Sequence, residues 1–364
     1  MNWSWTLSRY LALQFLTSVM IVFGGCVALG FIIDVVELFN RTSGKDNIGV
    51  GTVFFMALLK LPNLTEKMMP FAVLFGALWT FTRLTRSQEL VIARASGVSA
   101  WQFLAPPLAI ALVLGAFMTM VYNPIAAQMV ARYQQLEARY IRGRPSLLEV
   151  STNGLWLRQG DEPGQSVIHA LRVSDQGLQL QDVMILIYQG KDLFTGRIDA
   201  KSAILRNGFW DLTEAWVTAG GQPSVYHPKL QVTTKLTATT IQESFATPDT
   251  ISFWDLPRFI AFADAAGFKP TNHRLHWHAL LASPLLLCAM IFTGAAFSLR
   301  LARLGGAARL ILMGVLTGFL LYFFTNASQA LGKSGTVPVE LAAWAPALTA
   351  LLFGMTAVFN QEDG

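Results

Sequence analysis

The stretch YLALQFLTSVMIVFGGCVALGFII, residues 10–33, is apolar and contains no charged side chain. At about 1.5 Å of rise per residue, a helix of this length crosses a hydrocarbon core of roughly 30 Å. Three further uncharged runs have the same character, at residues 275–299, 310–332 and 341–361. These four runs predict a membrane protein built from spanning helices.

Two more spans are expected with less regular sequences. The run 95–131 is too long for one span, so its first residues should finish a cytoplasmic helix and the span should cover about 101–122. Before the short run 68–82 the apolar pattern is broken by charges and a proline between Lys60 and Lys67. This interruption predicts a surface-lying helix that leads into a span near 64–82, which brings the expected number of transmembrane helices to six.

The charged residues gather in one segment between the third and fourth spans. Residues 132–274 hold 15 of the 27 Lys and Arg residues and 14 of the 22 Asp and Glu residues, whereas the whole chain is 53% hydrophobic and only 13% charged. This distribution predicts an aqueous domain inserted into a membrane bundle. The net charge of +5 comes with no basic run of the nucleic-acid type, and both cysteines, Cys26 and Cys288, lie in apolar runs, so a disulfide framework in the inserted domain is excluded.

The inserted domain has the pattern of a β domain. Asn207-Gly208 between two apolar segments is a strong hairpin signal, and an antiparallel sandwich or open barrel is the expected result. Ser252 and Asp255 should form a capping box that opens a short helix ending near Ala266, before Gly267. The short segments with turn residues between them, several of alternating polarity, are 154–158, 167–173, 178–188, 197–205, 209–217 and 230–237.

Cations near the span ends favour a cytoplasmic N-terminus, with the first run read as an uncleaved span. With both termini inside and the β domain outside, seven basic residues lie on the cytoplasmic side and five on the outer side. The inside set is Arg9, Arg83, Arg86, Arg94, Arg300, Arg303 and Arg309, and the outside set is Arg41, Lys45, Lys60, Lys67 and Lys333.

Enzymatic chemistry is not indicated. The chain has no G-x-x-x-x-G-K-[ST], H-E-x-x-H, G-x-S-x-G or C-x-x-C motif, so we expect neither catalytic residues nor a cofactor. His273, His276 and His278 have loose metal spacing without a nearby carboxylate cluster, and we expect no metal site. Asp34 and Glu37 could form a proton relay, but their place at the exit of the first span favours an interfacial location.

The cytoplasmic segment 85–97, TRSQELVIARASG, has the features of a short capped helix. Thr85 and Gln88 could form a capping box, and Gly97 could supply the left-handed stop. Such a helix suits docking in a groove of a soluble ATPase, although a plain amphipathic connector has the same pattern. A transporter without a P-loop needs such a partner.

Several short patterns resemble the LptF and LptG family of lipopolysaccharide-export permeases, and LptG more than LptF. The resemblance covers the whole chain. It implies six transmembrane helices, a periplasmic β-jellyroll after the third, and a place in the bacterial inner membrane. The patterns are Arg86-Ser-Gln-Glu-Leu through Ala95-Ser-Gly97, Pro70 and Phe75-Gly-Ala-Leu78 upstream, and Gly154-Leu-Trp156 downstream.

The resemblance also implies partners and a division of the chain. One LptF-like and one LptG-like permease would enclose a cavity, two copies of an LptB-like ATPase would bind below, and a bitopic LptC-like protein would join at the lateral gate. Lipopolysaccharide would leave the inner membrane and pass through the jellyrolls toward the outer membrane. The expected parts are spans one to three in 1–131, the β-jellyroll in 132–250, a connecting helix in 251–272 and spans four to six in 273–364.

Candidate site residues follow from the same resemblance and from the chemistry of lipid A, whose anionic head and acyl chains require cations above an apolar wall. Asp34 and Asn63 stand where relatives can have lysine. The residues expected at the ATPase are Arg86, Glu89, Leu90 and Arg94; those expected at the lipid headgroup are Arg41, Lys45, Lys60, Lys67 and Arg132; those expected around the acyl chains are Phe71, Leu74, Phe319 and Tyr322.

Two other functions fit parts of the sequence. A membrane-anchored scaffold would use the β domain to bind a periplasmic partner, with the spans as an anchor only. A proton-driven carrier would need midplane carboxylates and inverted repeats, and the sequence offers few of the former and no detectable sign of the latter.

Overall fold

A computed structural model describes residues 5–43, 49–141, 155–161, 164–174, 179–189, 193–206, 208–219, 222–234, 247–265, 270–304 and 307–362. The chain folds as two compact units. The helical unit comprises Met1–Ala131, Asp249–Leu256 and Thr271–Gly364, and the β unit comprises Arg132–Pro248 and Pro257–Pro270.

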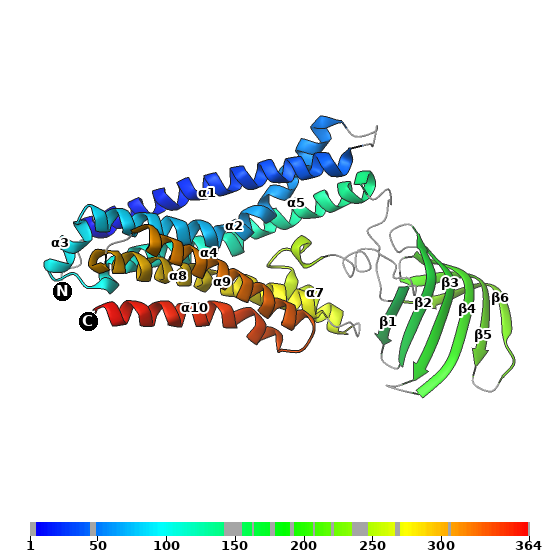
Figure 1. Ribbon diagram of the computed structural model, residues 1–364. Helices are drawn as coiled ribbons and strands as arrows, with labels where there is room; N and C mark the ends of the chain where they lie inside the picture. The colour runs from blue at the N-terminus through cyan, green and yellow to red at the C-terminus, as the bar shows by residue number, and fades with distance from the viewer. Residues whose placement is uncertain are drawn as a thin grey trace. The chain divides into compact units, whose positions relative to one another are not determined.

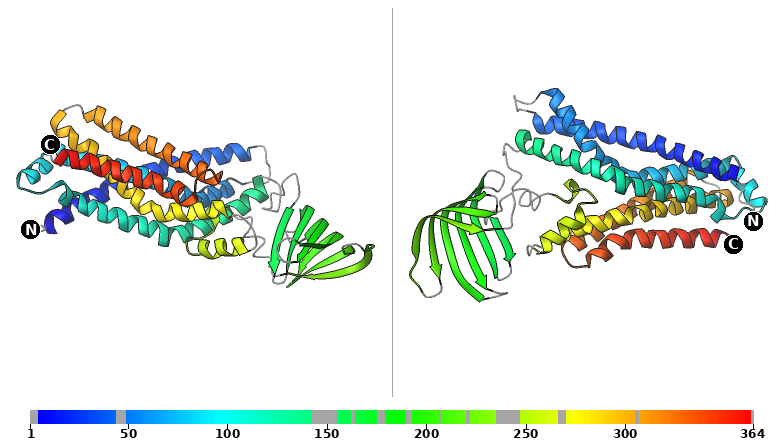
Figure 2. Two further views of the ribbon diagram at one scale, coloured as in Figure 1. Left: turned by 90° about the horizontal axis from the view of Figure 1, so that it is seen from below. Right: turned by 180° about the vertical axis from the view of Figure 1, so that it is seen from behind.

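Long helices that run alongside one another make up the helical unit (Figure 1). The short helix α3 and the described ends of the chain lie at the same end of this bundle in every view (Figures 1 and 2). The helices are α1 (Trp5–Thr42), α2 (Val50–Arg86), α3 (Glu89–Ala95), α4 (Ala100–Phe117), the π-helical turn η1 (Met118–Tyr122), α5 (Asn123–Leu136), the π-helical turn η2 (Glu137–Ile141), α8 (Thr271–Leu304), α9 (Ala307–Lys333) and α10 (Val339–Glu362), of which α5 and η2 continue into the β unit.

Five helical segments of the described chain are long and apolar enough to cross a membrane: Trp5–Thr42, Val50–Arg86, Ala100–Ile141, Thr271–Ser298 and Val339–Asn360. They cover five of the six predicted spans. The remaining prediction, 310–332, coincides with α9, a 27-residue helix that packs against α8 and α10 but falls outside this set. The fold is therefore a mostly helical membrane protein.

The second span differs from its prediction. Residues 50–86 form one continuous helix through Pro62 and Pro70, rather than a surface helix followed by a span. Two of its charged residues have partners on neighbouring elements, since Lys60 pairs with Asp34 and Glu66 accepts a hydrogen bond from Asn123. Neighbouring helices can supply hydrogen-bond and charge partners to a spanning helix that contains polar residues or prolines. The sequence of that one segment does not show these partners.

Close packing between helices depends on glycines at the crossing points. A Cβ added to Gly115 on α4 would lie 2.6 Å from the Cα of Pro284 on α8, and one added to Gly76 on α2 would lie 2.8 Å from the Cα of Val19 on α1. Small residues let membrane helices approach until their backbones touch. The core of the bundle forms around these contacts, with Phe15, Phe81 and other apolar side chains fully buried.

Six antiparallel strands in sequential order form a single curved sheet in the β unit (Figure 2). Trp210, Ile185 and Leu212 are fully buried in its core. The strands are β1 (Leu155–Asp161), β2 (Gly164–Ser174), β3 (Gln179–Gln189), β4 (Leu193–Arg206), β5 (Phe209–Ala219) and β6 (Val225–Thr233).

The structure has a strand at each of the six predicted segments, although β6 begins at Val225 rather than Leu230 and ends at Thr233, and the predicted positions 235–237 lie outside the described residues. The predicted hairpin is also present, because Arg206 pairs with Phe209 across the turn and Gly208 has a φ of 87°. The described strands form one meander and not the two faces of a sandwich, so jellyroll connectivity stays a prediction.

The predicted capping box before the helix that follows the β strands is present only in part, because the Asp255 carboxylate bonds the Ser252 hydroxyl and not its backbone N–H. The Ser252 hydroxyl accepts from the Asp255 N–H at 3.3 Å and donates to the Asp255 carboxylate at 2.5 Å. The helix α7 follows as Leu256–Ala265, after the short 3-10 turn η4 (Pro248–Thr250). The predicted stop at Gly267 lies outside the described residues.

Candidate functional site

The connection between α2 and α4 contains α3, the predicted docking helix. Gly97 after it has a φ of 91°, which confirms the left-handed stop. The capping box of Thr85 and Gln88 is wrong, because α2 continues through Arg86 and leaves Thr85 inside the preceding helix. Gln88 instead takes a left-handed conformation as the N-cap of α3, without a side-chain hydrogen bond.

Glu89 is held by two hydroxyl groups. Its Oε2 accepts from the Tyr10 hydroxyl of α1 at 2.9 Å, and its Oε1 accepts from the Ser87 hydroxyl at 2.8 Å. The carboxylate is exposed, so the one lone-pair site that remains on each oxygen can face solvent or a partner. This geometry orients an acid at the surface and connects α3 directly to α1.

The apolar residues of α3 divide between the core and the surface. Leu90, one of the predicted docking residues, is buried in the core of the bundle. Val91 and Ile92 are 47% and 65% exposed, so they offer the apolar surface of this helix. Arg86 is exposed and Arg94 is partly buried.

Charges at the far end of α1 form an ion-pair cluster. The Lys60 Nζ lies 2.5 Å from an Asp34 oxygen and 3.8 Å from a Glu37 oxygen, and Arg41 also pairs with Glu37. Asp34 is only 8% exposed. Two of the predicted headgroup cations therefore neutralise carboxylates of the chain itself.

This cluster leads to a stability prediction. Lys60→Met should destabilise the protein because it leaves the buried Asp34 carboxylate unpaired, whereas the double variant with Asp34→Asn should recover most of the loss. We expect a coupling energy of about 1–3 kcal/mol between the two sites, measured by thermal unfolding of the detergent-solubilised protein. Strictly additive effects would show that the pair contributes nothing to stability.

The other predicted headgroup residues do not join this cluster among the described contacts. Lys67 is exposed on α2, in the helical unit, and Arg132 is exposed on α5, within the β unit. Lys45 lies outside the described residues.

Three of the four predicted acyl-chain residues meet where α2 contacts α9. The ring centroid of Phe71 lies 5.6 Å from that of Phe319 and 5.4 Å from that of Tyr322. Leu74 is fully buried one turn further along α2, against Gly318. Phe319 and Tyr322 are both nearly half exposed, so the cluster presents an aromatic surface backed by a packed core.

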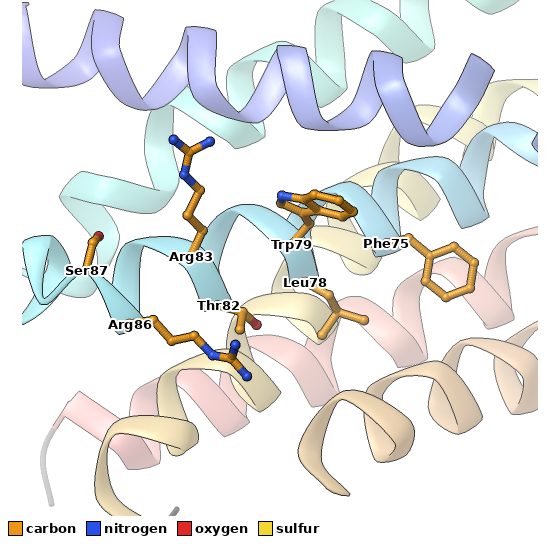
Figure 3. A pocket seen from close by; sticks show the side chains of 7 residues that line it. All are labelled: Phe75, Leu78, Trp79, Thr82, Arg83, Arg86 and Ser87. Carbon is orange, nitrogen blue, oxygen red and sulfur yellow. The ribbon is translucent and has the colours of Figure 1, made fainter. Parts of the chain in front are cut away.

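A pocket of about 660 Å³ follows α2 from this aromatic surface toward α3 (Figure 3). Phe75 links the two, because its ring stacks on that of Phe71 with centroids 6.4 Å apart. Arg83 and Arg86 lie one turn apart on the same face of α2, where Arg83 extends toward α1 and Arg86 extends in the opposite direction. The lining residues are Phe75, Leu78, Trp79, Thr82, Arg83, Arg86 and Ser87.

Comparison with known proteins gives this arrangement a context. The model of the family described as lipopolysaccharide export system permease LptF/LptG matches residues 9–359. The chain belongs to this family. A permease of the family, the lipopolysaccharide export system permease protein LptG of Haemophilus influenzae, is 24% identical over 362 residues, which cover 96% of each chain. The LptF/LptG membership and the apolar helices make the chain a multi-pass protein of the bacterial inner membrane.

This LptF/LptG permease also contains a polar network that its sequence does not predict. Asn123 donates to Glu66 at 3.2 Å through its amide nitrogen and accepts from the Phe253 N–H at 2.9 Å through its oxygen. Asp249 accepts from Asn63 at 3.4 Å and lies 3.6 Å from the Nδ1 of His276. The segment 249–253 is thereby connected to α2, α5 and α8. The one signal of this network in the sequence is the presence of charged residues inside apolar stretches.

The histidines do not converge on a metal. His276 faces Asp249, whereas His278 accepts from the Trp344 indole at 3.4 Å and lies 3.9 Å from Glu340. Within the described ranges, no three His, Cys, Asp or Glu side chains are arranged to hold an ion.

Proposed function

We propose that this chain is the LptG-like permease subunit of an ABC transporter that extracts lipopolysaccharide from the inner membrane. The observation that carries the proposal is the surface of α3, where the exposed Val91 and Ile92 lie beside the oriented carboxylate of Glu89. An apolar pair next to an acid suits a groove on a soluble ATPase. Two copies of an LptB-like ATPase, a second LptF-like permease and an LptC-like protein complete the proposed assembly.

The proposed topology has six transmembrane helices, both termini in the cytoplasm and the β domain in the periplasm. It is supported by the common position of α3 and the described chain ends at one end of the bundle (Figure 1). An even number of crossings returns the chain to the side on which it began. With α9 as a span, the bundle has six.

The proposed lipid site runs along α2 and α9. Phe71, Phe319 and Tyr322 supply an aromatic wall for acyl chains, with Leu74 as its packed support. Lys67 and Arg132 remain candidate headgroup contacts together with Lys45. We assign Lys60 and Arg41 a weaker role, because Asp34 and Glu37 neutralise them.

Photocrosslinking tests this site and separates the transporter from a membrane-anchored scaffold. A photoreactive amino acid at Phe319 should give a lipopolysaccharide adduct in cells, because the side chain contributes to the proposed cavity. The matched control is Phe353 on α10, which is also apolar and is 80% exposed, but lies outside the proposed cavity. The readout is the adduct detected with an antibody against lipopolysaccharide.

A scaffold predicts a different pattern, with no lipid adduct at either position and only protein adducts from the β domain. Equal labelling at Phe319 and Phe353 would indicate bulk lipid and would contradict a cavity. A proton-driven carrier is less well supported, since Asp34 and Glu37, the candidate relay, are both in ion pairs.

A further inference from the structure

The pocket along α2 adjoins the aromatic surface at Phe75 and has two chemically different ends. Phe75, Leu78 and Trp79 form an apolar end, and Thr82, Arg83, Arg86 and Ser87 form a polar end with two guanidinium groups (Figure 3). None of the seven lining residues is acidic. An amphipathic anion matches such a surface better than a neutral or wholly apolar molecule does.

We propose that this pocket binds an anionic glycerophospholipid of the leaflet that faces α3. Guanidinium groups bind phosphate through paired, charge-assisted hydrogen bonds. The apolar end lies further into the bilayer by about 1.5 Å per residue along α2, so that Phe75 is roughly 16 Å deeper than Arg86. The polar end can therefore hold a phosphate while the glycerol and the first part of an acyl chain lie along Leu78 and Trp79.

The two arginines are not equivalent. With its amide oxygen turned toward Arg83, Gln14 of α1 accepts from the Nη1 at 2.9 Å and from the Nε at 3.3 Å. Arg86 extends away from α1. Arg86 is thus the principal phosphate ligand, and Arg83 supplies positive charge from a fixed position.

Trp79 is the second feature that points to a lipid. Its side chain is 58% exposed beside these arginines. Exposed tryptophans of membrane proteins concentrate at headgroup depth, where the ring lies among acyl chains and its N–H reaches polar groups. Ser87 lines the pocket, and its hydroxyl donates to the Glu89 carboxylate. A bound lipid would therefore contact the turn that orients Glu89.

The proposal rests on the proposed topology, and lipid binding by the isolated chain tests it independently of export. Native mass spectrometry of the purified full chain would measure retained phosphatidylglycerol, phosphatidylcholine and lipopolysaccharide. We expect preferential retention of phosphatidylglycerol, and about tenfold weaker binding in Arg86→Gln, which loses a charge-assisted contact. Trp79→Ala should also weaken binding.

Matched controls are Arg9→Gln, an exposed arginine near the same end of the bundle, and Phe353→Ala on α10. Both should retain phosphatidylglycerol like the unaltered chain. Equal retention in Arg86→Gln and Arg9→Gln would overturn the proposal. Displacement of phosphatidylglycerol by lipopolysaccharide would also overturn it, because the pocket would then belong to the lipopolysaccharide cavity. Loss of phosphatidylglycerol preference with intact lipopolysaccharide adducts at Phe319 would leave the proposed function unaffected.

Discussion

Glu89→Ala is expected to abolish lipopolysaccharide export while the protein still inserts and folds. The carboxylate is exposed and oriented by Tyr10 and Ser87, so its removal affects the surface of α3 and not the core. Loss of an acid from a desolvated interface costs about 2 kcal/mol or more, or roughly a 30-fold weaker affinity for the ATPase. Association can be measured by titrating the purified ATPase onto the permease in nanodiscs.

Two further variants test whether the charge of Glu89 is the property that matters. Glu89→Gln keeps the shape of the side chain and removes its charge, so a defect as large as that of alanine would identify the charge as the essential property. Glu340→Ala removes an exposed acid from the start of α10 and should leave both association and export unchanged. Normal export together with normal ATPase affinity in Glu89→Ala would refute the role of α3.

Gly115→Leu should cause the largest loss of stability. A Cβ at this position lies 2.6 Å from the Cα of Pro284, so α4 and α8 would have to separate before the new side chain fits. Overpacking of this kind costs about 3 kcal/mol, which should lower the melting temperature by several degrees and reduce the yield of folded protein. Fluorescence-detected size-exclusion chromatography after heating would measure both effects.

Gly25→Leu on α1 is the matched control. Nothing lies within 4 Å of a Cβ added to Gly25, so the same substitution should change the stability by only about 0.5 kcal/mol. Similar losses in the two variants would mean that leucine disturbs insertion in general. The close approach of α4 to α8 would then not be the cause.

Much of this fold could be predicted from local sequence patterns. The alternating strands and the Asn207-Gly208 turn predict the β sheet, because side-chain alternation and turn chemistry are properties of short segments. The uncharged runs likewise predict five of the helices that can cross a membrane. The aromatic contact of Phe71 with Phe319 and Tyr322 also agrees with the residues expected around acyl chains, although their role stays a prediction.

Features that depend on distant partners could not be predicted. The charges of α2 indicated a break, yet Asp34 and Asn123 satisfy Lys60 and Glu66 from other helices. Thr85 has the chemistry of an N-cap and so predicts that α2 ends before it, but the residue lies within this longer helix. Leu90 is among the residues expected at the ATPase, but tertiary packing buries it and leaves Val91 and Ile92 exposed instead.

Affinity purification of this chain from its native membrane, followed by native mass spectrometry of the intact assembly, tests the central claim most directly. The account predicts a complex in which one copy of this chain is accompanied by two copies of an ATPase and one copy of a second six-span permease. Recovery of the folded, membrane-inserted chain with periplasmic partners alone, and without any ATPase, would contradict it.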